Sequence, residues 1–266
     1  MAIVWLNDQL IDDSTESSGS ARIPLTDRSF LLGEGVFETL LTINSKAVAL
    51  DRHYRRLFHG AQTLGIAAPT LDEVAIAVTK LLHATSSISL GRLRITLSGS
   101  GTLLVTHQSY TEWSEPARLV TYPHPFNAKS ALRDVKSTSY GEHLLAFKYA
   151  QERKADDALI FNHEGGIMEA STANIVALIG AKWVTPPLSA GPLPGITREL
   201  LLEWGLVTER EIIFEELQRC EAIALVSSLR SVQPVGEING RRYKTNGKVD
   251  ELASSYKTTL AGNLNP

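Results

Sequence analysis

Short apolar runs and amphipathic periods alternate along the chain, with polar turns between them. Apolar residues recurring at helical spacing predict helices, and apolar runs bounded by Gly, Asn or Ser predict strands. In chain order the pattern predicts a hairpin at 3–6 and 9–11, a polar loop at 12–20, helices at 51–65 and 71–83, and strands at 91–97 and 102–106. The alternation indicates a mixed α and β protein.

The polar stretch HQSYTEWSEPAR, at 107–118, has no periodic apolar pattern and contains a proline. We interpret it as the connection between two domains. The predicted bounds are a small α+β domain at 1–107, a connection at 108–118 and a larger domain at 119–266 that contains both Lys136 and Glu169.

Composition narrows the possible functions. The chain has 266 residues, 43% of them apolar, which suffices for one large or two modest cores. A net charge of −3 leaves no basic stripe for nucleic acid. Cys220 is the single cysteine, so one chain forms neither a disulfide nor a thiolate metal site, and no histidines have H-E-x-x-H spacing. With no secretory leader and no long apolar run, we expect a cytoplasmic protein without a membrane partner.

The most informative stretch is VKSTSYGEHLLAFKYAQERKADDALIFNHEGGIMEASTAN, at 135–174. Lys136 precedes a predicted helix at about 140–154, and the run ALIF at 158–161 predicts a strand. A tight turn follows, after which a return strand carries Glu169. A helix and a hairpin in this order can bring the lysine and the glutamate to one wall of a pocket.

Such a pair suits pyridoxal 5'-phosphate (PLP). A lysine amine can form a Schiff base with the cofactor aldehyde. A carboxylate against the ring nitrogen keeps that nitrogen protonated, so that the ring accepts electrons. We therefore assign Lys136 as the catalytic, cofactor-bonded lysine and Glu169 as the partner of the ring nitrogen.

Several motifs in a fixed order carry a family resemblance. K-x-x-x-Y, A-D-D-A-L-I-F, G-G-I-M-E-A-S-T-A-N, T-P-P-L and L-P-G-I-T-R resemble the fold type IV PLP enzymes, over about Trp5 to Val235. This family includes branched-chain aminotransferases, D-amino-acid aminotransferases and 4-amino-4-deoxychorismate lyases. The resemblance implies a two-domain α+β fold, like that of D-amino-acid aminotransferase. Its expected parts are a small α/β sandwich N-terminal domain and a larger pseudo-barrel C-terminal domain.

The resemblance also implies roles for residues near the N-terminus. The stretch DRSFLLGEGVFET resembles the family opening D-R-x-x-x-x-G-D-G-x-F-E-T, with Glu34 in place of the usual aspartate. Arg55 and Arg56 cannot point the same way on a helix, and the family pattern H-x-x-R-L selects Arg56 as the ligand of the cofactor phosphate. Arg94 either contacts a substrate carboxylate or points outward. Tyr140 either bonds the phenolic oxygen of the cofactor or belongs to the core.

Two turns near the C-terminus complete the predicted site. The Gly195-Ile196-Thr197 turn begins a helix, where unpaired backbone N–H groups suit a phosphate, and it matches the family phosphate turn. The stretch SSLRSVQPV, at 227–235, resembles the lyase pattern N-S-L-R-G-V-x-P-V rather than the G-T-A-A-E-I of branched-chain aminotransferases. On that resemblance Ser228 contacts the phosphate, and Leu229 and Arg230 face the substrate, unless Arg230 is only part of a turn.

The predicted function is that of a PLP-dependent 4-amino-4-deoxychorismate lyase. It would form 4-aminobenzoate and pyruvate, a step of folate biosynthesis, from a small-molecule amine. The alternative is a class IV aminotransferase acting on D-amino acids, branched-chain amino acids or amines. The family resemblance further predicts a homodimer, because the small domain would otherwise leave its side of the pocket open.

Overall fold

The computed structural model describes residues 3–12, 22–244 and 247–266. The chain divides into two compact units, which are described in turn. Unit 1 comprises Met1–Thr111, Val135–Tyr140 and Asn263–Pro266, and unit 2 comprises Glu112–Asp134 and Gly141–Gly262. The predicted loop at 12–20 lies outside the described residues except for Asp12, which ends a strand.

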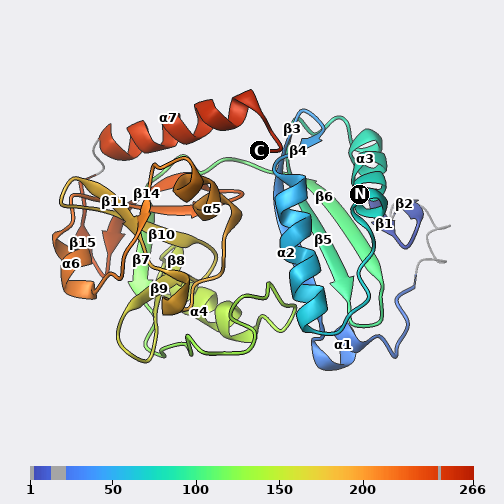
Figure 1. Cartoon of the computed structure of the whole chain (residues 1–266), viewed down its shortest axis with the longest axis horizontal. Helices are drawn as coiled ribbons and strands as arrows, with labels where there is room; N and C mark the ends of the chain where they lie inside the picture. The colour runs from blue at the N-terminus through green and yellow to red at the C-terminus, as the bar shows by residue number, and fades with distance from the viewer. Residues whose placement is uncertain (1–2, 13–21, 245–246) are drawn as a thin grey trace. The chain divides into compact units, whose positions relative to one another are not determined.

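Unit 1 is an antiparallel sheet with helices packed on it (Figure 1). Its strands are β1 (Ile3–Leu6), β2 (Gln9–Asp12), β3 (Gly35–Ile43), β4 (Lys46–Ala47), β5 (Leu90–Ser98) and β6 (Leu103–Ser109), and its helices are α1 (Arg28–Leu32), α2 (Leu50–Thr63) and α3 (Leu71–Ala84). The strand order is β2-β1-β6-β5-β3-β4. Helix α2 packs against β3, and α3 packs against β1 and β6. The predicted hairpin, both helices and both strands are therefore confirmed.

Alternation along the strands of unit 1 produces its core. Leu93, Ile95 and Leu97 of β5 are 0–1% exposed, as is Leu40 of the neighbouring strand. Successive residues of a strand point to opposite faces, so these side chains share the face that the helices cover. Helix α3 begins with a capping box, in which Thr70 and Glu73 each bind the other's backbone N–H.

Unit 2 is built on a nine-stranded mixed sheet. Its strands are β7 (Ala117–Thr121), β8 (Asp157–Phe161), β9 (Ile167–Ala170), β10 (Asn174–Ile179), β11 (Lys182–Thr185), β12 (Thr208–Glu209), β13 (Ala222–Ser227), β14 (Ser231–Ile238) and β15 (Arg241–Arg242). The helices are α4 (Gly141–Glu152), the 3-10 turn η2 (Leu188–Ala190), α5 (Ile196–Glu203), α6 (Phe214–Arg219) and α7 (Gly247–Gly262).

The sheet of unit 2 curls strongly. Its order is β12-β11-β10-β13-β14-β7-β8-β9, yet the end strand β9 also contacts β10, through a turn closed by Ala170 and Ala173. This gives a half-barrel, which agrees with the pseudo-barrel expected of the larger domain. Leu159 of β8 packs in the core of the curl, whereas its neighbours Ala158 and Ile160 pack with Ala146 of α4 on the other face.

The division differs from the predicted domain bounds. Strand β6 continues to Ser109 and β7 begins at Ala117, so the connection is shorter than 108–118. Lys136 belongs to unit 1, not to the larger domain as predicted, because its segment pairs with β3. Neither this pairing nor the five-residue helix α1 has a periodic signal in the sequence.

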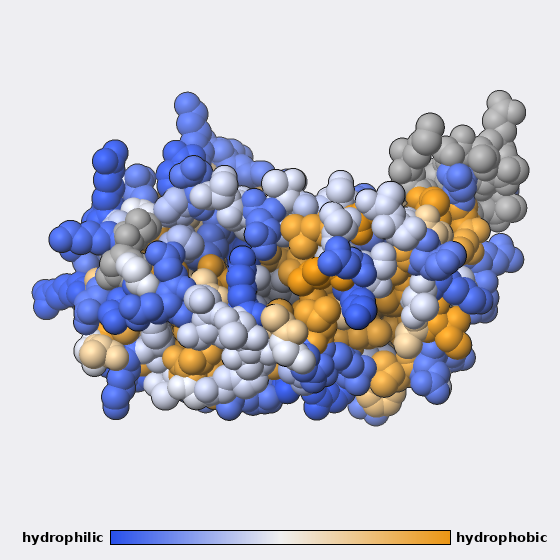
Figure 2. Space-filling model, turned by 90° about the horizontal axis from the view of Figure 1, so that it is seen from above, coloured by the Kyte–Doolittle hydropathy of each residue, from blue (hydrophilic) through white to orange (hydrophobic). Residues whose placement is uncertain are grey.

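Both hydrophilic residues and apolar patches lie on the face of the molecule drawn in Figure 2. Within the described ranges, no helix is both long and apolar enough to cross a membrane.

Candidate active site

In unit 1 the segment that carries Lys136 is held by backbone hydrogen bonds to β3. The N–H of Phe37 donates to the Lys136 carbonyl at 2.9 Å, and the N–H of Thr138 donates to the Gly35 carbonyl at 2.9 Å. A Cβ at Gly35 would lie 2.8 Å from the Leu97 carbonyl oxygen of β5 and 3.0 Å from Thr138 Oγ1, so the close approach at this position needs glycine. The lysine backbone is therefore positioned by the sheet rather than by the helix that follows it.

The Phe37 ring contacts three of the predicted site residues. The Lys136 Nζ lies 4.8 Å from the Phe37 ring centroid, and the Arg94 Cζ lies 3.8 Å from it. Tyr140 contacts Phe37 edge-on, with centroids 5.4 Å apart. Both cations are within the range of a cation–π contact. Burial, and to a lesser extent the charge of Arg92, lowers the pKa of Arg94.

Arg56 binds a buried carboxylate of unit 1. Its Nε and Nη2 donate to the two oxygens of Glu38 at 2.7 Å each, and His53 Nδ1 lies 2.6 Å from Glu38 Oε2. Burial opposes ionisation of Glu38, but Arg56 and His53 together lower its pKa to about 2. Burial lowers the pKa of His53, because it disfavours the charged imidazolium. Glu38 is therefore ionised at neutral pH, and it fixes the plane of the Arg56 guanidinium.

The structure also shows how two features noted in the sequence, the Arg55–Arg56 pair and Glu34, are accommodated. Arg55 is exposed and Arg56 half-buried, as expected of neighbours on a helix. Glu34, which stands where the family has aspartate, pairs with Arg28, and its carbonyl accepts from Ser29 Oγ at 2.6 Å. The longer side chain is accommodated by this ion pair.

In unit 2 Glu169 is held by donors on one oxygen. It is 4% exposed, and its Oε2 accepts from Asn174 Nδ2 at 3.2 Å and from the Leu193 N–H at 3.1 Å. His143 Nε2 lies 3.5 Å from the other oxygen. The two donors fix the carboxylate plane, as required of a group that is to face a protonated nitrogen.

The predicted phosphate turn adjoins this carboxylate through Asn174. The amide of Asn174 also donates to the Leu193 carbonyl at 2.9 Å, and a Cβ on Gly195 would lie 1.9 Å from Asn174 Oδ1. Glycine is therefore required at the N-cap of α5. Ile196 and Thr197 are its first two residues, so their backbone N–H groups lack partners within the helix. Among the described residues, the buried Oγ1 of Thr197 makes no hydrogen bond of normal geometry.

Arg230 lies in a different network of unit 2. Its Nη2 donates to Asp157 Oδ2 at 3.0 Å and to Thr172 Oγ1 at 3.1 Å, and its Nη1 donates to Gln233. The guanidinium also lies 4.4 Å from the ring centroid of Trp113. The side chains of Arg230 and Asp157 are 4% and 0% exposed. This arrangement favours the structural role of Arg230 over the predicted substrate contact, and neighbouring Ser228 and Leu229 stay predictions.

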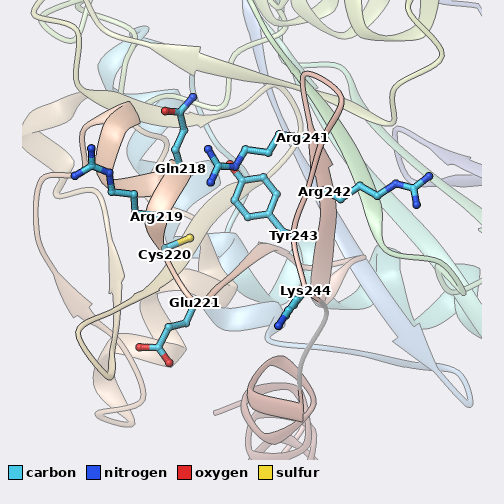
Figure 3. Close-up of a pocket in the computed structure, with 8 residues that line it drawn as sticks. All are labelled: Gln218, Arg219, Cys220, Glu221, Arg241, Arg242, Tyr243 and Lys244. Atoms are coloured by element: carbon cyan, nitrogen blue, oxygen red, sulfur yellow. The ribbon is translucent and has the colours of Figure 1, made fainter.

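One hollow of unit 2, of about 400 Å³, involves none of the predicted residues (Figure 3). It is lined by Gln218, Arg219, Cys220, Glu221, Arg241, Arg242, Tyr243 and Lys244. Arg219 and Arg242 point to opposite sides, away from Tyr243. Burial raises the pKa of the Cys220 thiol to about 12, so this thiol is protonated and is a poor nucleophile.

The structure thus gathers Lys136, Tyr140 and Arg94 in unit 1, and links Glu169 to the Thr197 turn in unit 2. The sequence analysis missed four residues that organise these groups: Glu38, His53, Asn174 and His143. Asn174 and Glu38 stand inside the quoted motifs S-T-A-N and F-E-T, so the motifs themselves held the signal. His53 likewise opens the quoted pattern H-x-x-R-L. His143 had no such signal, because its partner Glu169 lies 26 positions later in the chain.

Comparison with known proteins identifies the class to which this fold and site belong. The profile of the amino-transferase class IV family matches residues 35–238. A D-alanine aminotransferase from Staphylococcus aureus is 24% identical over 95% of this chain and 94% of its own. A Schizosaccharomyces pombe protein named "Putative aminodeoxychorismate lyase" is 28% identical over 74% of this chain and 87% of its own.

The chain belongs to the class IV aminotransferase family and is a PLP-dependent enzyme. The fold agrees with that of solved relatives. A hypothetical aminotransferase from Mycobacterium tuberculosis, solved with PLP bound, superposes with a TM-score of 0.87 at 21% identity, over 98% of this chain and 100% of its own. The fold type IV architecture expected from the sequence is thereby confirmed.

Arg230→Ala tests the structural role of the buried pair. The variant leaves the Asp157 carboxylate buried without its cation, and we expect the free energy of unfolding to fall by about 3 to 5 kcal/mol. Chemical denaturation of the variant and the wild type measures this change.

The matched control is Arg118→Ala, which removes an exposed partner of Asp156 at 4.0 Å and should cost less than about 1 kcal/mol. A substrate role would appear differently. In that case Arg230→Ala would keep its stability while kcat/KM fell roughly 10- to 150-fold, the loss of one charge-assisted contact.

Proposed function

We propose that this enzyme is a 4-amino-4-deoxychorismate lyase, which releases pyruvate and forms 4-aminobenzoate. The proposal is supported chiefly by the turn between β13 and β14. Ser231, which stands where the lyase pattern has glycine, adopts a φ of 53°. Glycine favours this left-handed region and serine rarely adopts it. The turn therefore has the backbone conformation that the lyase-like glycine would allow, despite the substitution.

The site residues fit PLP. The buried Oγ1 of Thr197, which makes no hydrogen bond of normal geometry among the described residues, and the first N–H groups of α5 suit a phosphate. Ile196 contributes one of these N–H groups. The carboxylate of Glu169, fixed by two donors, suits a protonated ring nitrogen. We assign Lys136 to the cofactor aldehyde, and Arg56 and Ser228 to the phosphate. Tyr140 is assigned to the phenolic oxygen.

The protein residues divide the work of the reaction. PLP, when bound, supplies an electron sink for the bonds that break at the substrate. With PLP and substrate bound, the Lys136 amine would remove the proton from the substrate carbon that bears nitrogen. Glu169 holds the proton on the ring nitrogen. Arg94 and Leu229 are assigned to the substrate side. Loss of pyruvate then yields an aromatic ring, which drives the elimination.

The same proton removal by Lys136 would also serve a transamination. A D-alanine aminotransferase that spans nearly the whole chain supports this second candidate. Its substrates would be D-amino acids, branched-chain amino acids or amines.

Product analysis separates the two reactions. PLP-loaded enzyme is incubated with 4-amino-4-deoxychorismate, and separately with a panel of amino acids and keto acids. We expect 4-aminobenzoate and pyruvate in equal amounts from the first reaction, and little transamination from the second. Lys136→Ala, as the control, should form neither product.

Steady transamination without any 4-aminobenzoate would contradict the lyase proposal and support the aminotransferase. Both products are measured in the same preparation, so a poorly loaded enzyme is recognised by the failure of both reactions.

We also propose a homodimer with a surface centred on α1. Leu25, Phe30, Leu31 and Leu32 are 59–86% exposed, and α1 has no buried residue. The helix is nevertheless well anchored. Asp27 caps its first turn through the Ser29 N–H and accepts from Ser98 Oγ at 2.7 Å. A rigid, apolar and exposed helix is typical of an association surface. A second copy is favoured as the partner because the family resemblance predicts a homodimer.

Phe30→Asp should weaken association, because it places a charge in the centre of an apolar interface. Light scattering should give twice 29.1 kDa for the wild type and 29.1 kDa for the variant at low micromolar concentration. Ile76→Asp, at a 51% exposed apolar residue of α3, is the matched control and should remain dimeric. A monomeric wild type with full activity would contradict the proposal.

A further inference from the structure

The C-terminal helix α7 packs on β13 and β14 of unit 2 through one apolar stripe. Val249, Leu252, Tyr256 and Leu260 are its buried residues, and they recur at helical spacing. Tyr256 is 3% exposed and is the only member of the stripe with a polar group. Phenylalanine would fill the same space without the cost of burying a hydroxyl, so the Tyr256 hydroxyl requires an explanation.

Tyr256 contacts residues at both ends of α5, the helix that begins with the predicted phosphate turn. Its ring packs against Trp204, at the C-terminal end of α5, with ring centroids 5.6 Å apart. Its hydroxyl lies at Thr197, in the first turn of the same helix. This contact lowers the pKa of Tyr256, although burial has the larger effect and raises the pKa overall.

Thr197 is 1% exposed, and its Oγ1 makes no hydrogen bond of normal geometry in the part of the chain that the structure describes. This hydroxyl therefore has Tyr256 as a neighbour but makes no well-formed hydrogen bond, which is uncommon for a buried polar group. A hydroxyl can accept one hydrogen bond while it donates another. If Tyr256 donates to Thr197 Oγ1, the Thr197 proton is directed to a different acceptor.

We propose that Tyr256 positions the Thr197 hydroxyl to donate to the phosphate of PLP, which makes α7 part of the cofactor-binding structure. The inference rests on the proposed function, in which the turn at 195–197 binds the phosphate. Tyr256 does not touch the phosphate itself. It acts through Thr197 and is a positioning residue.

Cofactor affinity with and without the phosphate tests this role. Apoprotein is titrated with PLP and with pyridoxal, which lacks the phosphate, and the two Kd values are measured by absorbance. Tyr256→Phe should raise the Kd of PLP roughly 3- to 10-fold, as expected for one hydrogen bond, and leave the Kd of pyridoxal unchanged. Thr197→Val should raise the Kd of PLP at least as much. The double variant should bind PLP no more weakly than Thr197→Val alone, because the two hydroxyls act in series.

Leu260→Val is the matched control, since it loosens the same stripe without removing a hydroxyl and should leave both Kd values unchanged. An equal loss of PLP and pyridoxal affinity in Tyr256→Phe would reveal a merely structural tyrosine and overturn the inference. Unchanged affinities in Tyr256→Phe would overturn it as well. If instead the turn at 195–197 does not bind the phosphate, Thr197→Val will have the same Kd for PLP as the wild type, which distinguishes failure of the proposed site from failure of this inference.

Discussion

The backbone pairing between β3 and the segment at 135–138 is the constraint on which the candidate site depends. It holds the Lys136 backbone against β3, in which two consecutive residues, Phe37 and Glu38, each contact a separate group of site residues. Phe37 contacts Lys136, Arg94 and Tyr140, whereas Glu38 binds Arg56 and His53. Consecutive residues of one strand thus place both the lysine and the ion-paired arginine, and the charge of Lys136 contributes to the lowered pKa of His53.

Unit 2 depends on a comparable organising residue. Asn174 donates to both Glu169 and the Leu193 carbonyl, and its side chain occupies the space that any Cβ on Gly195 would need. The Asn174 amide thus positions both the Glu169 carboxylate, which suits a ring nitrogen, and the turn at Gly195, which suits a phosphate.

Local patterns predicted most of the fold. The helix predicted at 71–83 is Leu71–Ala84, and the strand predicted at 158–161 is Asp157–Phe161, because amphipathic period and burial coincide there. The predictions were weakest where a partner distant in sequence decides the outcome. Lys136 belongs to unit 1 through β3, a partner about 100 residues earlier in the chain.

Arg230 illustrates the same limit for the site. Its motif resembled a substrate loop, but Asp157, 73 positions earlier in the chain, binds its guanidinium in the interior. A single sequence does not contain this pairing in any local pattern. The cofactor roles that the motifs imply for Glu169 and the Thr197 turn stay predictions, although the structure does link the two through Asn174, a residue of the quoted motif.

The assignment of Lys136 is the claim on which the mechanism rests, and borohydride reduction tests it most directly. PLP-loaded enzyme is reduced, digested and mapped by mass spectrometry to locate the pyridoxyl group. The account predicts a single modified peptide that carries Lys136. A pyridoxyl group on any other lysine, with Lys136 unmodified, would contradict it.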